Sequence, residues 1–242
     1  MRMGWSRAAR VMFLFGSLAL TVRGARGEEP AESPPRLLVV WHDAHHLYPG
    51  THRGVAREVA SLFAPLDVEM HWQGAKQYDP ALDVRTILVR VVLLPSDPSG
   101  PGWELEEDVM GAVLPSNGRK RSIYIFYKTV VRGLKIKAHD GRLPDLNERD
   151  LLERALGRVV AHEMIHAVAP SVRHAQHGLM RRGVTRSFLA RNELVLAGSL
   201  KSAFEAGVVA ILSSTSSPVA SGAAGPQAVR HAFGNASETD GT

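Results

Sequence analysis

The feature of this chain that most constrains its fold is an apolar-faced segment from residue 147 to residue 170. Asn147 can cap a helix that we expect to start at about Glu148. Pro170 should end it, because proline cannot continue a helix. Apolar residues recur between these points at the spacing of one helix face, at Leu151, Leu152, Ala155, Leu156, Val159 and Val160. We therefore expect one long helix whose apolar face packs into the core.

The last turns of this helix carry His162-Glu163-Met164-Ile165-His166, which is the pattern H-E-x-x-H. Residues i and i+4 lie on one helix face, so both imidazoles can bind a single Zn²⁺. Glu163 lies next to that face, where a carboxylate can take a proton from water and pass it to a leaving group. The pattern predicts a zinc site with a general base. The alternative is that both histidines cover a surface helix and Glu163 is solvated.

A catalytic zinc site needs a third protein ligand and an open position for water. A turn after Pro170 can bring His174 back to the metal, and we take His174 as the third ligand. His177 is a second candidate. Glu193, the one acid in range on the next expected helix, is a third.

The residues His162–His166, His174 and Met180 resemble the zincin metallopeptidases and, within them, the metzincins. Metzincins have the pattern H-E-x-x-H-x-x-G-x-x-H followed by a Met-turn. The resemblance implies Zn²⁺ bound by three histidines, a Glu general base and a methionine packed beneath the metal. This chain departs from the pattern in two ways: Ala169 stands where the glycine would be, and the third histidine comes two residues later.

Other features around the motif allow two interpretations each. Met180 is either the Met-turn residue or an ordinary core methionine. Gly178 can supply a positive φ at the turn under either interpretation. By resemblance, the strand expected at Ser122–Tyr127 could lie along the cleft and pair with an extended peptide. The alternative is a plain strand within the sheet.

The rest of the chain predicts a zincin-like α+β fold. It would have a mixed β-sheet, an active-site helix and a small helical C-terminal subdomain. β-Branched or apolar runs predict strands at Leu37–Trp41, Val68–Trp72, Ile87–Leu94 and Ser122–Tyr127. Helical spacing predicts further helices over residues 53–64 and from Thr185, as a cap, to Leu196.

Residues 1–27 are typical of a secretory signal peptide. Arginines without acids precede the apolar run Val11–Val22, and small residues follow at Ala25–Gly27. Twelve apolar residues are too few for a membrane span, which needs about 20. We expect a secreted or periplasmic protein with no membrane span after signal cleavage. The alternative is an uncleaved N-terminal anchor.

The remaining chain divides into a linker at 28–35, a zincin-like metallopeptidase domain at 36–212 and a tail at 213–242. The tail is mostly Ser, Thr, Ala, Gly and Pro, so we expect it to be disordered. Signal cleavage would remove five arginines and no acid, leaving 24 basic and 24 acidic residues. The net charge of +5 is therefore no argument for nucleic-acid binding.

Two functional hypotheses follow. The first is a secreted zinc-dependent metallopeptidase that acts on a peptide or protein through zinc-activated water and Glu163. The second is a non-catalytic, zinc-stabilised exported binding module, which would keep the histidines but would not need Glu163. A second ligand-rich segment, His42–His46, could hold another metal or could simply cap the following loop and helix.

Overall fold

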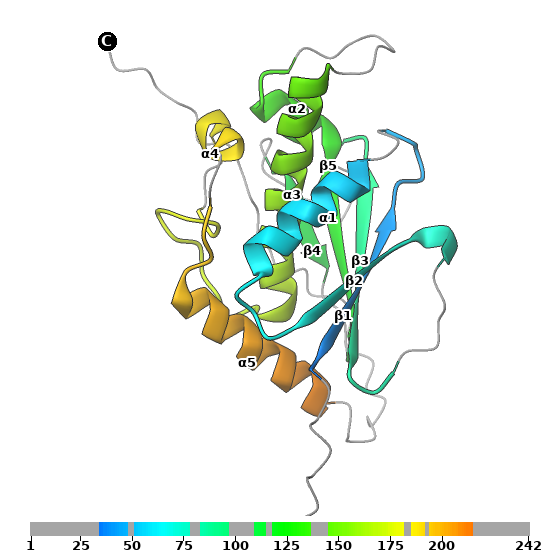
Figure 1. The fold of residues 1–242 in the computed structure, drawn as a ribbon, viewed down its shortest axis with the longest axis vertical. Helices are drawn as coiled ribbons and strands as arrows, with labels where there is room; N and C mark the ends of the chain where they lie inside the picture. Colours follow the sequence, from blue (N-terminus) through cyan, green and yellow to red (C-terminus); the bar gives the residue numbers. More distant parts are fainter. Residues whose placement is uncertain are drawn as a thin grey trace, which may run out of the picture. The chain divides into compact units, whose positions relative to one another are not determined.

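A computed structural model of the chain describes residues 34–47, 51–77, 83–96, 109–114, 118–136, 145–181, 185–191 and 194–214. The strands among them are β1 (Arg36–His42), β2 (Glu69–Gly74), β3 (Thr86–Leu94), β4 (Gly111–Leu114) and β5 (Lys120–Phe126). The helices are α1 (Thr51–Phe63), α2 (Tyr127–Gly133), α3 (Leu146–Val168), α4 (Arg186–Ala190) and α5 (Gly198–Ser214), with a 3₁₀ turn at Ala75–Gln77 (Figure 1). The expected signal peptide, nearly all of the expected linker and residues 215–242 lie outside the described residues.

The five strands form one mixed sheet in the order β2-β1-β3-β5-β4. β2, β1, β3 and β5 run parallel, and β4 pairs antiparallel with β5 at the end of this order. β1 and β3 are nearly continuous apolar runs and lie within the sheet, as expected for strands buried on both faces. The predicted α+β architecture with a mixed sheet is confirmed, although β4, α2 and α5 were not predicted.

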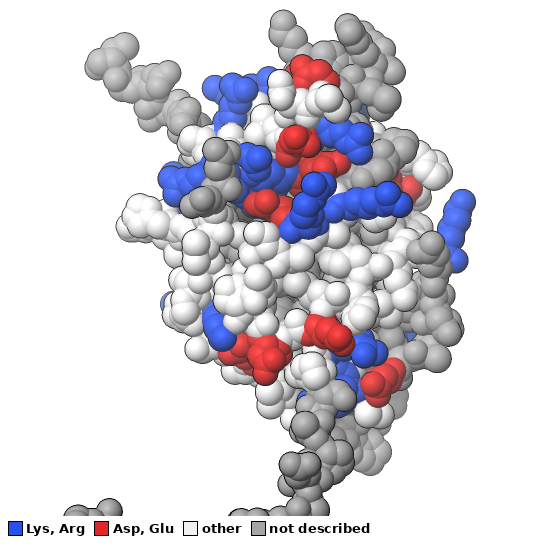
Figure 2. Space-filling view, viewed as in Figure 1, with Lys and Arg blue, Asp and Glu red and all other residues white. Residues whose placement is uncertain are grey.

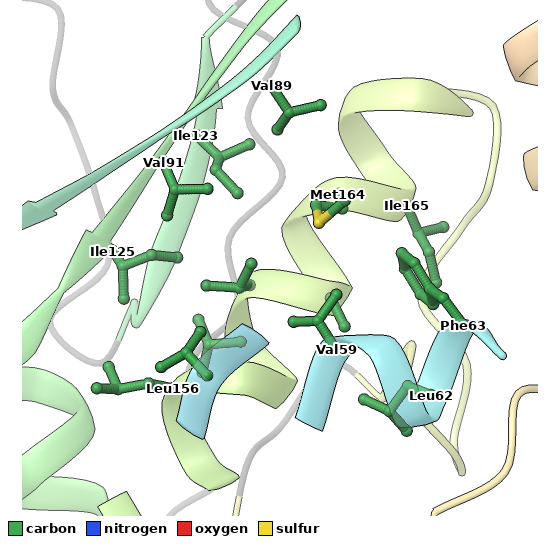
Figure 3. Close-up of a cluster of buried hydrophobic side chains, with 14 of the residues drawn as sticks. Val59, Leu62, Phe63, Val89, Val91, Ile123, Ile125, Leu156, Met164 and Ile165 are labelled. Atoms are coloured by element: carbon green, nitrogen blue, oxygen red, sulfur yellow. The ribbon is translucent and has the colours of Figure 1, made fainter. Parts of the chain in front are cut away.

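The main core lies between the sheet, α1 and α3. Figure 3 shows side chains from these elements pointing toward one another. They include Val59, Leu62 and Phe63 of α1, Val89 and Val91 of β3, Ile123 and Ile125 of β5, and Leu156, Met164 and Ile165 of α3. All are buried, so α3 is fixed by apolar contacts from both the sheet and α1.

Glycines allow α3 to approach its neighbours closely. A Cβ at Gly157 of α3 would lie 2.6 Å from the Cβ of Glu58 and 3.2 Å from the carbonyl oxygen of Val55, both on α1. A Cβ at Gly207 of α5 would collide with the carbonyl oxygen of Val168, the last residue of α3. Close packing at the two ends of the buried section of α3 therefore requires glycine at positions 157 and 207.

The start of α3 differs from the prediction. Asp145, not Asn147, is the N-cap: its side chain accepts a hydrogen bond from the backbone N–H of Glu148 at 2.8 Å. The Glu148 carboxylate accepts in return from the Asp145 N–H, which completes a capping box. This reciprocal pair satisfies two backbone donors, whereas the residue three positions after Asn147 is Asp150, not the Glu or Gln of a capping box. The predicted end before Pro170 is confirmed.

The helix predicted from Thr185 to Leu196 was wrong in its length. Thr185 does cap a helix, since its side chain accepts from the N–H of Phe188 at 3.3 Å. That helix, α4, already ends at Ala190, and Arg191 is extended. The last carbonyls of α4 instead accept hydrogen bonds from arginines of α3, as described below. The next helix, α5, begins at Gly198.

Charged side chains of both signs are intermingled over α1 and α3 on the face drawn in Figure 2. Arg57 of α1 and Arg149 of α3 both pair with the carboxylate of Glu153, which is largely buried. These contacts tie the two helices together at their solvent side. Within the described ranges, no helix has the length and apolar character that crossing a bilayer requires.

The close α1–α3 contact predicts that Gly157→Ala destabilises the protein. Alanine is the better helix former, but its Cβ would overlap Glu58, and overpacking of this kind costs about 1–3 kcal/mol. Denaturant unfolding measures the loss. Gly198→Ala is the matched control, because a Cβ there meets nothing within 4 Å. Equal unfolding free energies for the two variants would contradict the predicted contact.

Candidate metal centre

Three histidine side chains converge at the C-terminal end of α3. The Nε2 atom of His174 lies 3.2 Å from Nε2 of His162 and 3.2 Å from Nε2 of His166. His162 and His166 are buried on α3, and His174 is half-buried in the turn that follows Pro170. The structure therefore brings together the three residues selected from the sequence, and their nitrogens lie within 4.8 Å of one another.

The spacing of these nitrogens fits a zinc ion. A tetrahedral site with Zn–N bonds of about 2.0–2.1 Å places its ligand nitrogens about 3.3–3.4 Å apart. The lone pairs of three imidazole nitrogens that point at one another also repel, unless a proton or a cation lies between them. Imidazole is a common zinc ligand, so the donor set and the observed 3.2 Å separations both suit Zn²⁺.

The ring of His162 is held in place by the backbone. Its Nδ1 lies 2.8 Å from the carbonyl oxygen of Leu179, which accepts a hydrogen bond from the Nδ1–H tautomer. That tautomer leaves Nε2 with a free lone pair pointing at the other two rings, which is how ligand histidines are usually oriented. A backbone carbonyl thus selects the form of His162 that can bind a metal.

The turn that supplies this carbonyl has a defined shape. Gly178 has φ +75°, which confirms the predicted positive φ. The Ala175 N–H donates to the Met180 carbonyl at 2.7 Å and closes the turn that follows His174. Met180 itself is buried in the main core. The turn therefore links the position of His174 to the carbonyl that orients His162.

Glu163 follows His162 directly in the chain, and its side chain faces strand β4. Its side chain is fully buried, and neither carboxylate oxygen has a hydrogen-bond partner among the described residues. Burial raises the pKa of Glu163 well above its usual range, because the charged form is desolvated. The alternative interpretation of a solvated Glu163 on a surface helix is wrong. Buried carboxylates without partners are costly and concentrate at functional sites.

The other candidates for metal binding do not join this cluster. His177 is exposed and is not part of the three-residue group, and Glu193 lies outside the described residues. No metal-ligand group forms around His42–His46 in the part of the chain that the structure describes. Asp43 there accepts a hydrogen bond from the N–H of Leu47 at 3.1 Å, so it caps the loop.

Arg158, one helical turn before His162, was missed by the sequence analysis. Its guanidinium is fully buried and pairs with Glu58 of α1 at 2.9 Å. It also donates to the carbonyls of Phe188, Leu189 and Arg191 at the end of α4. A charged residue in an otherwise apolar helix face was the available signal. Arg158 fixes the C-terminal segment against the helix that carries the histidines.

The strand expected along the cleft is not an edge strand. β5, which contains most of Ser122–Tyr127, pairs with β3 on one side and with β4 on the other. It therefore has no free edge for a peptide, and the plain-strand interpretation is correct. β4 is the strand at the end of the sheet on this side, and Gly111 of β4 contacts Glu163.

Solved structures similar to this chain include the archaemetzincin from Methanopyrus kandleri. It is 14% identical, the match covers 75% of this chain and 99% of that one, and the TM-score is 0.44. Another is a zinc-dependent peptidase from Methanocorpusculum labreanum, which is 14% identical over 69% of this chain and 99% of its own, with a TM-score of 0.46. No protein-family model matches the chain, and neither does any curated protein.

The geometry predicts which histidine completes the site. The purified protein should hold about one zinc ion per chain, as expected for one three-histidine site. His174→Ala should weaken zinc binding by more than about a hundredfold, the upper end of what loss of an outer-shell contact costs. Elemental analysis and competition with a chromogenic chelator measure both quantities. His177→Ala is the control and should bind as the parent does; the reverse result would make His177 the ligand.

Proposed function

We propose that this protein is a zinc-dependent peptidase. The observation that carries the proposal is the convergence of three imidazoles, with Nε2 of His174 lying 3.2 Å from Nε2 of His162 and of His166. Glu163, which follows His162 in the chain, adds a buried carboxylate without a partner among the described residues. Together these groups form the donor set and the general base that metal-assisted hydrolysis requires. We assign His162, His166 and His174 as the zinc ligands and Glu163 as the catalytic base.

In this proposal the three histidines and Glu163 have separate roles. A zinc ion held by the three histidines would supply Lewis acidity toward a water and toward the scissile carbonyl. Glu163 accepts the proton that the attacking water loses as its oxygen bonds to the carbonyl carbon. Glu163 then delivers that proton to the amide nitrogen as the C–N bond breaks.

Among the described residues no strand pairs with the edge of β4 that faces away from β5, and this edge suits an extended peptide substrate. The N–H of Phe126 donates to the carbonyl of Met110 at 2.9 Å, so these two residues face each other as a hydrogen-bonded pair. Pairing alternates along antiparallel strands, so Gly111 and Val113 direct their N–H and C=O groups away from β5. A peptide added there would pair by main-chain hydrogen bonds close to Glu163.

The alternative of a non-catalytic, zinc-stabilised binding module accounts for the histidines alone. It gives no reason to bury a carboxylate without partners beside them, since a structural zinc site needs no base. The burial of Glu163 therefore favours the peptidase.

Replacing the base while keeping its shape separates the two functions. Glu163→Gln should retain about one zinc ion per chain and lose roughly 10²–10⁴-fold in peptide hydrolysis, because the amide cannot accept the proton. A fluorogenic peptide library and elemental analysis of the same samples measure the two effects. Zinc binding with no hydrolysis by the parent chain would support the binding module instead.

We also propose that the protein is exported. The support is the sequence of residues 1–27 with its arginines, short apolar run and small residues. Expression in a bacterial host with a working secretory pathway should yield a processed protein outside the cytoplasm, with a new N-terminus near Glu28. Mass spectrometry of the N-terminus measures this. Replacing Leu18 and Leu20 by Arg should stop processing; a chain that stays unprocessed in both forms would contradict cleavage.

A further inference from the structure

Gly111 of β4 lies directly against the side chain of Glu163. A Cβ built at Gly111 would be 2.8 Å from Cγ of Glu163 and 2.9 Å from its Oε1. Both distances are shorter than real Cβ contacts, so any larger residue at position 111 requires Glu163 or β4 to move. The φ of Gly111 is not in the left-handed region. Glycine is therefore required there for space and not for backbone conformation.

Glu163 has little room to give way. Its side chain is fully buried, and the helix that carries it is buried without interruption from Ala155 to Ala169. The residues beside it in the chain, His162 and Met164, are also buried. A side chain at position 111 would push the carboxylate away from β4 or push β4 away from α3. Either change alters where the carboxylate lies relative to the neighbouring imidazoles.

We propose that Gly111 is a positioning residue for Glu163, an inference that rests on the proposed function. The absent side chain at Gly111 leaves the space in which the carboxylate lies against the edge strand. Its backbone N–H and C=O face away from β5, toward the edge where we propose that a peptide pairs. In this proposal Gly111 contacts the base through its Cα, which carries no side chain, and the substrate backbone through its N–H and C=O.

A stability cycle on the full, metal-free chain tests the packing part of the proposal. Gly111→Ala should lower Tm by roughly 3–10 °C, as overpacking does in a domain of this size. In a Glu163→Ala background, where Cγ and the carboxylate are gone, the same substitution should lower Tm by less than about 1 °C. Gly198→Ala is the control for a glycine in open space. Equal losses in both backgrounds, or no loss in the parent, would overturn the proposal.

If Gly111→Ala alone does not fold, recovery of folded protein on adding Glu163→Ala supports the same conclusion, and failure of the double variant to fold refutes it. The activity part is tested on zinc-loaded protein well below Tm. There Gly111→Ala should keep its zinc and lose roughly 10–100-fold in kcat with KM nearly unchanged, because a base about 1 Å out of place is ineffective.

An unchanged kcat in folded, zinc-loaded Gly111→Ala would show that Gly111 does not position the base. The two proposals can fail separately. A parent chain that hydrolyses no peptide refutes the proposed function, whereas the Tm cycle still decides whether Gly111 makes the space for Glu163.

Discussion

The requirement that buried polar groups find partners organises much of this structure, because the helix with the histidines is buried on all sides in its second half. From Ala155 to Ala169 every residue of α3 and its C-cap is buried. Polar groups on such a helix cannot turn to water, so they must be satisfied by neighbouring segments or remain costly. The chain places Arg158, His162, Glu163 and His166 in this stretch. α1, α4 and the turn after Pro170 supply the partners of Arg158 and His162.

Arg158 and His162 are satisfied by backbone carbonyls from the C-terminal segment. Arg158 takes three carbonyls at the end of α4 in addition to Glu58, and His162 takes the carbonyl of Leu179. Removing one partner of a buried charge typically costs about 3–5 kcal/mol, so these contacts hold the C-terminal segment firmly to α3. Residue Arg154 adds a hydrogen bond to the carbonyl of Ala190. The segment after the motif is therefore fixed largely by polar groups of the motif's own helix.

The sequence was sufficient where the chemistry is local. The i, i+4 histidines, the helix end before Pro170 and the positive φ at Gly178 all follow from short-range rules. One local feature was missed, because Asp145 and not Asn147 caps α3 and Glu148 returns the hydrogen bond. The sequence was insufficient where distant segments compete, since α4 stops early and its last carbonyls accept from Arg158. The order of the strands was the feature least predictable from the sequence. β4 has four residues, and only its pairing with β5 shows that β4, not β5, forms the edge.

Glu163 differs from Arg158 and His162, which lie on the same helix. Arg158 is surrounded by four acceptors and His162 by a well-placed carbonyl, yet both oxygens of Glu163 lack partners within the described residues. A fold under selection for stability alone would fill this position with an apolar side chain, since the surroundings are already buried. Gly111 has no side chain and so lacks the packing that one would provide, which leaves room for the carboxylate. Positions 111 and 163 thus both lower the stability of the fold for the sake of one carboxylate. This is the pattern expected when that group has to react and not merely to pack.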